Sequence, residues 1–296
     1  MTDYGREVRF GVFLIPMADG DPVAQAVEAE RLGLDYVGIQ DHPYQRRFVE
    51  VFALLSMIAG STTRIGLFPD VACLPLRPPA VMAKTAASID VLSGGRFELG
   101  LGAGAFWDAI DAYGGTRLSP GESLDALEEA IEVIRKVWSG DRGLRFEGVH
   151  YHLSGAHSGP VPSHPIGIWL GVYGPRALGI AGRLADGWVP SLRDDLTTLS
   201  TMSSRLDEAA TVAGRDPSEI RRILNISGTI TDGPSSGVLR GPVDQWAEEL
   251  TVLALGHGFD TFITSADDPG HLARFAEEVA PTVREMIVTE RGGRAV

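Results

Sequence analysis

Short apolar runs rich in Val, Ile, Leu and Phe alternate along the chain with longer stretches in which apolar positions recur at helical spacing. The short runs are typical of strands buried on both faces, and the longer stretches are typical of amphipathic helices. Such regular alternation indicates parallel βαβ units. Strands are predicted at residues 9–15, 35–40, 63–68, 96–102, 166–172, 187–190, 221–230 and 259–264.

A helix is predicted after each of these strands. Prolines in the first turn and glycines after the last turn mark several of the ends, as at Pro22 and Gly33. The helix at about 121–138 has the clearest pattern, with one continuous apolar stripe. Helices are predicted at about 21–33, 50–59, 79–92, 121–138, from 174 onward, through 196–206, at 242–255 and at 268–287.

Eight strand–helix pairs predict an α/β fold in which residues 1–296 form a single (β/α)8 TIM-barrel domain. A doubly wound sheet is disfavoured, because the segment FLIPMADGDP after the first strand lacks a glycine fingerprint. Residues 144–165 interrupt the alternation. There LRFEGVHYHL reads as two short strands around Glu147 and Gly148, so we expect a hairpin inserted before the fifth strand.

Composition limits the classes of function. The 26 basic and 39 acidic residues give a formal net charge of −13, so neither nucleic acid nor an anionic membrane is an expected partner. Cys73 is the single cysteine, which excludes an internal disulfide and suits a reducing cytoplasm. No apolar run approaches the roughly 20 residues that span a bilayer, and the N-terminus lacks a signal-peptide core. We therefore expect a cytoplasmic protein that acts on a small molecule.

Chemistry in such a barrel is expected where strands end and the following loops begin. The second strand is followed by Asp41, His42, Pro43 and Tyr44. His42 is the best candidate for a general acid or base, because its ordinary pKa lies near neutrality. Asp41 is expected to orient the imidazole or to accept a hydrogen bond from a cofactor. The alternative for this pair is an ordinary turn before proline.

The loops after the fourth and fifth strands offer further candidates. Glycines at 100, 102 and 104 would let a planar ring approach the backbone, or they form a flexible loop leading to Phe106 and Trp107. The segment 171–176 leads from a strand into a helix, where backbone amides and Arg176 could bind an anion, although Gly-Pro is also plain punctuation before a helix. Phe13, Tyr44, Phe106, Trp107 and Tyr173 are candidates for an apolar pocket that takes a planar substrate; each could instead be core.

Two other clusters are given structural interpretations. The loop 70–79 contains three prolines, which favours a rigid wall, and Cys73 within it is expected to be a small buried filler. His150, His152, His157 and His164 fall in the predicted hairpin and the loop after it. No carboxylate partner is evident for them, so we expect solvated positions and no metal site.

Three stretches carry a family resemblance: AERLGLDYVGIQDH, LRPPAVMAKTAASIDVLSGGRFELGLGAG and GPRALGIAGRLADGW. They resemble the luciferase-like monooxygenase superfamily, which includes bacterial luciferase-type flavin enzymes and coenzyme F420-dependent reductases and dehydrogenases. The resemblance implies that Asp41 and His42 contact a deazaflavin. It also implies a non-prolyl cis bond at Asp70–Val71. With the residues at the ends of the fourth and fifth strands added, the candidate cofactor-binding residues are Asp41, Asp70, Val71, Ala72, Cys73, Gly102, Ala103, Gly104, Tyr173, Gly174, Pro175 and Arg176. The resemblance places the last three at a phosphate.

The leading hypothesis is hydride transfer between bound F420 and a small organic substrate, with His42 as the catalytic residue. The alternatives are an FMN-dependent monooxygenase and a non-catalytic flavin-binding barrel. Many F420-dependent dehydrogenases of this superfamily place a Glu after the strand-four glycines, whereas this chain has Ala105, Phe106 and Trp107. A sugar-phosphate substrate is therefore not expected. The resemblance also favours a homodimer.

Overall fold

The apolar runs of the sequence form parallel strands whose residues, as in Tyr36–Ile39 and Ile168–Leu170, are buried on both faces. The computed structural model describes residues 2–192, 196–265 and 268–293. Its main sheet consists of β1 (Arg9–Leu14), β2 (Tyr36–Ile39), β3 (Gly66–Pro69), β4 (Ala72–Cys73), β5 (Leu99–Gly102), β8 (Ile168–Leu170), β9 (Gly187–Trp188), β10 (Arg221–Asn225) and β13 (Thr261–Ser265).

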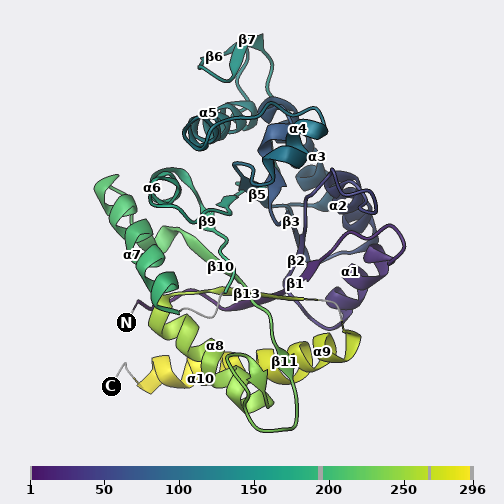
Figure 1. Ribbon diagram of the computed structural model, residues 1–296, viewed down its shortest axis with the longest axis vertical. Helices are drawn as coiled ribbons and strands as arrows, with labels where there is room; N and C mark the ends of the chain where they lie inside the picture. The colour runs from purple at the N-terminus through teal and green to yellow at the C-terminus, as the bar shows by residue number, and fades with distance from the viewer. Residues whose placement is uncertain (1, 193–195, 266–267, 294–296) are drawn as a thin grey trace.

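This sheet closes into a barrel. Its strands are paired in parallel in the order β3-β2-β1-β13-β10-β9-β8-β5-β4. β3 and β4 are two parts of the third barrel strand, so both ends of the sheet belong to one stretch of chain. The Leu67 amide donates to the Arg96 carbonyl and the Glu98 amide donates to the Leu67 carbonyl, each over 2.8 Å, which joins β3 to the segment before β5. The eight-stranded barrel predicted from the sequence is confirmed (Figure 1).

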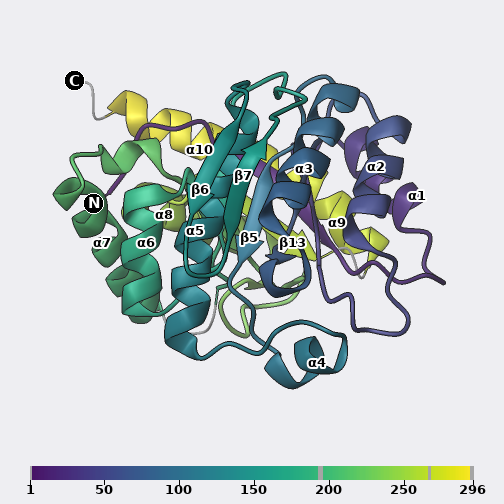
Figure 2. The ribbon, with the colours of Figure 1, turned by 90° about the horizontal axis from the view of Figure 1, so that it is seen from above.

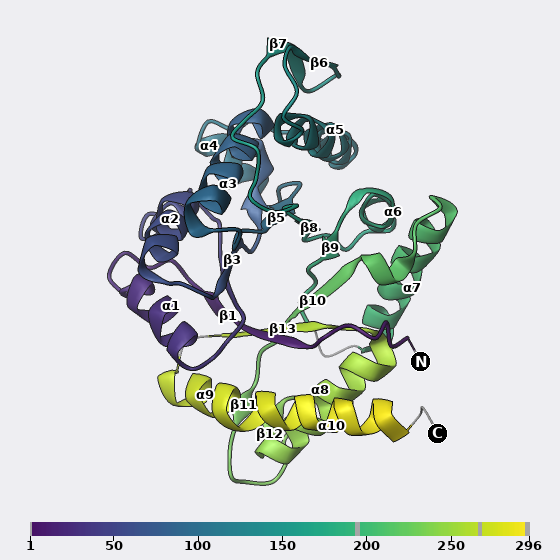
Figure 3. The ribbon, with the colours of Figure 1, turned by 180° about the vertical axis from the view of Figure 1, so that it is seen from behind.

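Helices surround the strands (Figures 1 and 3). Of these, α8 (Val243–His257) and α10 (Ala280–Gly293) lie side by side across β1 and β13. Residues near the end of a helix can fix where it begins. At the start of α5 (Pro120–Trp138), the Ser119 hydroxyl accepts from the Glu122 amide, and the Glu122 carboxylate accepts from the Ser119 amide. The helices are α1 (Pro22–Arg31), α2 (Val51–Ser61), α3 (Pro79–Ser93), α4 (Trp107–Ala112), α5 (Pro120–Trp138), α6 (Pro175–Leu184), α7 (Leu196–Val212), α8 (Val243–His257), α9 (Pro269–Arg274) and α10 (Ala280–Gly293), with a π-helical turn at Phe275–Val279. Within the described residues, no helix is long and apolar enough to cross a lipid bilayer.

The barrel interior is filled with large side chains. Tyr36, Phe68, Trp169, Ile223 and Ile263 form one buried cluster, in which the Trp169 ring meets those of Tyr36 and Phe68 edge-on at centroid distances of 5.4 and 5.0 Å. These side chains fill the barrel below its C-terminal end, so a ligand can enter only above them.

Three additions depart from the regular alternation. β6 (Leu144–Glu147) and β7 (His152–Ala156) pair antiparallel as a hairpin that projects from the barrel (Figure 1). The seventh strand ends at Asn225 rather than at 230, because β11 (Thr229–Ile230) leaves the barrel and pairs with β12 (Arg240–Gly241). The short helix α4 was not predicted, and Figure 2 shows it apart from the helices that flank the strands.

Candidate functional site

A cavity of about 730 Å³ opens at the C-terminal ends of the strands. Fifteen of the predicted site residues line it, and two do not. Those that line it are Phe13, Asp41, His42, Tyr44, Asp70, Val71, Ala72, Cys73, Gly102, Ala103, Gly104, Phe106, Trp107, Tyr173 and Gly174. The fold therefore brings together segments that lie far apart in the sequence, as expected for the C-terminal mouth of a barrel.

His42 lies in the cavity wall, half-buried, and it contacts two aromatic residues. Its Nδ1 is 2.7 Å from the Tyr44 hydroxyl, and the Phe106 ring meets its imidazole edge-on with a centroid distance of 5.2 Å. Nε2 has no hydrogen-bond partner among the described residues. Burial lowers the pKa of His42, and the nearby Asp41 carboxylate opposes that shift only in part. The imidazole is therefore mainly neutral at neutral pH.

The Asp41 side chain bonds Arg77 and not His42. Its carboxylate, 1% exposed, accepts two bonds from the Arg77 guanidinium, at 2.5 and 3.0 Å. It also accepts from the Cys73 amide at 2.8 Å, and Arg77 in turn bonds Glu50 at 2.7 Å. Tyr44, not Asp41, thus orients the imidazole, while Asp41 ties the loop after β2 to the loop after β3.

The peptide bond between Asp70 and Val71 is cis, as the family resemblance implied. The Val71 side chain packs against two glycines on neighbouring strands: a Cβ on Gly102 or Gly171 would lie 2.9 or 2.8 Å from Val71 Cγ2. A Cβ on Gly104, whose φ is +98°, would likewise lie 2.7 Å from Pro75. These glycines thus make room for the loop after β3.

Cys73 lies in the same loop and is buried. Burial, with a contribution from the Asp41 carboxylate, raises the pKa of its thiol to about 11. The un-ionised thiol is a poor nucleophile, which agrees with its interpretation as a small filler.

The N-terminus of α6 reaches the cavity through Gly174, which has no side-chain cap. The amides in the first turn of a helix have no intrahelical acceptor, so they can bind an anion. Pro175 and Arg176 do not line the cavity. The Arg176 guanidinium bonds Asp125 and the Gly121 carbonyl on α5 instead, so its predicted contact with a phosphate stays a prediction. No lysine or arginine is found among the described residues that line the cavity.

The deep end of the cavity contains a residue that the sequence analysis did not find. Asn225, at the end of β10, donates from Nδ2 to Asp70 Oδ1 over 3.1 Å. Asp70 Oδ2 and Asn225 Oδ1 are buried without a partner among the described residues. Burial raises the pKa of Asp70 to about 7, and the Asn225 bond offsets part of the shift.

Other lining residues were also missed, although a positional signal existed. They lie at or just after the C-terminal ends of β9 and β10, at the start of α5 or, for Gln40, directly after β2. The candidates came mainly from the second to fifth strands. At the rim, Ser191 after β9 donates its amide to the Tyr173 hydroxyl over 3.1 Å. The missed lining residues include Gln40, Ser123, Leu124, Val189, Ser191 and Asn225.

Comparisons with known proteins identify the family of the chain. The sequence model of the luciferase-like monooxygenase family matches residues 16–236. The chain is 31% identical over 265 residues to an F420-dependent glucose-6-phosphate dehydrogenase of Kineococcus radiotolerans, covering 86% of this chain and 74% of the relative. It is 33% identical over 221 residues to an F420-dependent hydroxymycolic acid dehydrogenase of Mycobacterium tuberculosis, covering 71% of this chain and 59% of the relative.

Solved structures share the fold at lower identity. An F420-dependent secondary alcohol dehydrogenase in complex with an F420–acetone adduct superposes with a TM-score of 0.83 at 20% identity. The match covers 94% of this chain and 99% of that one.

Proposed function

This chain belongs to the luciferase-like monooxygenase family, and we propose that it is an oxidoreductase that transfers hydride between coenzyme F420 and a small organic substrate. The proposal rests on His42, a neutral imidazole in the cavity whose Nδ1 is held by Tyr44 and whose Nε2 has no partner among the described residues. The F420-dependent dehydrogenases among its relatives support the choice of cofactor.

The cavity fits a planar ring with an anionic tail. Its volume of about 730 Å³ lies within the range of sites for small molecules and cofactors. Val71–Cys73 and the small residues Gly102–Gly104 line the cavity where the ring would lie, and the α6 N-terminus offers amides for a phosphate. A bound deazaflavin would supply the carbon that accepts or donates the hydride.

The role of His42 is to hold or accept the proton that accompanies hydride transfer. When Nδ1–H donates to the Tyr44 oxygen, Nε2 carries a lone pair and can take the proton of a substrate hydroxyl. In the reverse direction, protonated Nε2 returns that proton to a carbonyl oxygen. The Asp41–Arg77 ion pair fixes the segment from which His42 projects.

The substrate we propose is an uncharged alcohol or carbonyl compound with an apolar body. The lining residues described include no lysine or arginine to neutralise a phosphate group on the substrate. Phe13, Tyr44, Phe106 and Trp107 provide aromatic surface instead. Glucose 6-phosphate, the substrate named for one relative, is therefore not expected to be turned over.

Cofactor choice is tested by titrating the purified protein with F420 and, separately, with FMN while following the fluorescence of each. We expect saturable binding of F420 and hydride transfer from simple secondary alcohols to it. Tight binding of FMN with reductant-dependent oxygen uptake would instead establish the monooxygenase. Binding of FMN with neither reaction would establish a non-catalytic flavin-binding barrel.

The role of His42 is tested by His42→Ala. Turnover should fall about 100-fold or more, because a positioned acid–base group usually contributes at least that much. The matched control is His152→Ala in the exposed hairpin, which should leave turnover unchanged. Turnover of His42→Ala within about threefold of the wild type would overturn the assignment.

We also infer that residues 1–296 form one domain that works in the cytoplasm as a homodimer. The unpaired, buried Cys73 supports a reducing compartment. Exposed apolar side chains on the adjacent helices α2 and α3 support association: Met57 is 62%, Val81 61% and Leu92 84% exposed. Light scattering after size-exclusion chromatography measures the mass directly, and a monomer at micromolar concentration would contradict the dimer.

A further inference from the structure

A hydrogen bond crosses the barrel beneath the cavity. Asp70 ends β3 and Asn225 ends β10, and four steps around the barrel separate these strands in either direction. The two strands therefore lie on opposite sides of the barrel. The bond from Asn225 Nδ2 to Asp70 Oδ1, 3.1 Å long, spans its interior between the aromatic cluster below and the cavity above.

The two remaining oxygens of this pair present a problem. Asp70 Oδ2 and Asn225 Oδ1 are both buried, and neither has a hydrogen-bond partner among the described residues. An ionised carboxylate oxygen and an amide oxygen are both acceptors, so they cannot satisfy each other. A buried acceptor without a donor is destabilising, and a buried unpaired charge is more so.

We propose that Asp70 and Asn225 form a protonated acid–amide pair, in which the hydroxyl on Asp70 Oδ2 donates to Asn225 Oδ1. One proton then satisfies both oxygens. Together with the bond from Nδ2 to Oδ1 it completes a closed ring of two hydrogen bonds, with the acid donating one and the amide donating the other. The floor of the cavity is then neutral and holds a proton.

The surroundings of Asp70 favour the neutral acid. No arginine, lysine or histidine forms an ion pair with it among the described residues. Pro69 and Val71 flank it along the chain. On β2 it meets Gly38, where a Cβ would lie 3.1 Å from Oδ2 and 2.7 Å from the Phe68 ring. The carboxyl thus occupies room that a side chain at Gly38 would take. With a pKa of about 7, Asp70 holds its proton in most molecules at pH 6 and in about half of them at pH 7.

The other titratable groups around the cavity are distinct from Asp70. On the loops after β2 and β3, Asp41 is neutralised by Arg77, and His42 bonds Tyr44. β1, β9 and β13 contribute side chains without charge: Phe13, Val189 and Ile263. Among the described residues, the other titratable side chains near the pair are Asp41, His42, Tyr44, Cys73, Arg77 and Tyr173 at the mouth, and Tyr36 below with the nearby Arg9, Glu98 and Arg221.

The protonated pair would favour hydride transfer to a ring bound above it, a role that rests on the proposed function. A ring that accepts a hydride gains negative charge, and an ionised carboxylate beneath it would oppose that charge. A neutral acid instead leaves the site receptive, as when a carboxylic acid is kept protonated in an apolar site. Asp70 is thus a positioning residue that sets the charge of the floor.

Infrared spectroscopy of the cofactor-free protein tests the pair itself. At pH 6 we expect the carbonyl stretch of a hydrogen-bonded carboxylic acid, which shifts in heavy water, fades as pH rises through about 7 and is absent in Asp70→Asn. Absence of this band in the wild type, or its persistence in Asp70→Asn, would overturn the proposal. Asn225→Leu removes the amide partner, so its acid band should move to the position of a free acid; an unchanged band would also overturn it.

Binding tests the role of the pair. If only the protonated floor accepts F420, the dissociation constant rises about tenfold between pH 6 and pH 8, because the competent fraction falls accordingly. Asp70→Asn keeps both hydrogen bonds through its amide, so its pH profile should be flat apart from ionisation of F420 itself and of His42. Equal pH profiles in the two proteins would refute the role. An acid band without F420 binding at any pH would refute the proposed function and leave the pair intact.

Discussion

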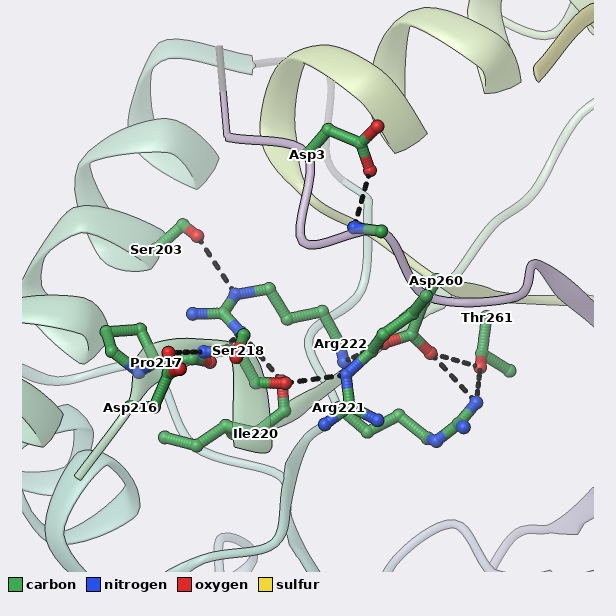
Figure 4. A network of polar contacts seen from close by, with 12 residues as sticks. Asp3, Ser203, Asp216, Pro217, Ser218, Ile220, Arg221, Arg222, Asp260 and Thr261 are labelled. Atoms are coloured by element: carbon green, nitrogen blue, oxygen red, sulfur yellow. Dashed lines mark hydrogen bonds and ion pairs between the residues drawn. The ribbon is translucent and has the colours of Figure 1, made fainter. Parts of the chain in front are cut away.

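The two ends of the barrel treat buried charge in opposite ways. At the amino end, Figure 4 shows Arg221 pointing toward Asp260 and Thr261, and Arg222 toward Ser203. The Arg222 side chain is fully buried, pairs with Asp207, and donates to the Ile220 carbonyl over 2.7 Å. At the carboxyl end, the cavity holds His42, whose Nε2 has no partner, and Asp70, whose carboxyl forms no ion pair among the described residues.

This difference separates stability from chemistry. Polar groups at the amino end are paired with one another, so they have little left to offer a ligand, and their loss should destabilise the fold. At the mouth, His42 keeps Nε2 open for a ligand, and Asp70 is kept neutral by a proton instead of by a counter-ion, so this end can bind and react. Mutations at the amino end should therefore change the free energy of unfolding, whereas mutations at the mouth should change ligand binding and turnover.

The largest effect is expected at the amino end of the barrel. Arg222→Met removes the cation that pairs with Asp207 Oδ1 and the donor to the Ile220 carbonyl, so we expect a loss of about 3–5 kcal/mol in the free energy of unfolding. Urea denaturation measures it, with the exposed Arg205→Ala on α7 as control. F420 binding per folded molecule should not change. If Arg222→Met unfolded at the same urea concentration as the wild type, the claim that the amino end mainly provides stability would be wrong.

A smaller effect, on turnover instead of on stability, is expected at the mouth for Tyr44→Phe. The ring remains, but the hydroxyl that holds His42 Nδ1 is lost, so turnover should fall about tenfold while stability changes little. The pH profile of kcat/KM should shift as well, because His42 loses its partner. Tyr113→Phe, at a tyrosine that is 60% exposed, is the control. An unchanged profile would show that Tyr44 does not orient the imidazole.

The smallest effect concerns pH and the amino end. His164 lies 2.7 Å from Asp90 through Nδ1 and 3.6 Å from Glu98 through Nε2, and the Glu98 interaction in particular raises the pKa of His164. Because the folded pKa lies above the unfolded value near 6.5, this stabilisation is complete below that value and is lost as pH rises through the folded pKa. The melting temperature of His164→Asn should therefore depend less on pH than that of the wild type. Parallel curves would exclude His164 as the source.

Much of the fold could be predicted because its signals are local. Buried strands need continuous apolar runs, and the Ser119–Glu122 capping box fixes the start of α5 within the sequence itself. The predictions that were wrong concern places where contacts between distant segments, and not the local hydrophobic pattern, determined the structure. β10 stops at Asn225 because the following residues leave the barrel to pair with Arg240–Gly241. Similarly, His164 was expected in solvent but lies against two carboxylates, those of Asp90 on α3 and of Glu98 before β5.

The candidate site was predictable only in part. His42 was found because it has the right chemistry at the end of a strand, and the residues around it came from the same rule of position. Asn225 was missed although it ends a strand, since an asparagine has no titratable group to draw attention to it. Arg176 was placed in the site by its sequence neighbours, yet Asp125 on another helix holds it.

The sequence by itself determined that this chain is a luciferase-like barrel with a reactive mouth at the ends of its strands, because apolar periodicity and the family stretches are properties of neighbouring residues. Only the tertiary structure decided which polar groups are already paired. Arg77 engages Asp41, Tyr44 holds His42, and Asn225 meets Asp70 across the barrel. Hydrogen bonds join atoms within about 3 Å regardless of their distance along the chain, so the division between structural and reactive groups exists only in the folded molecule.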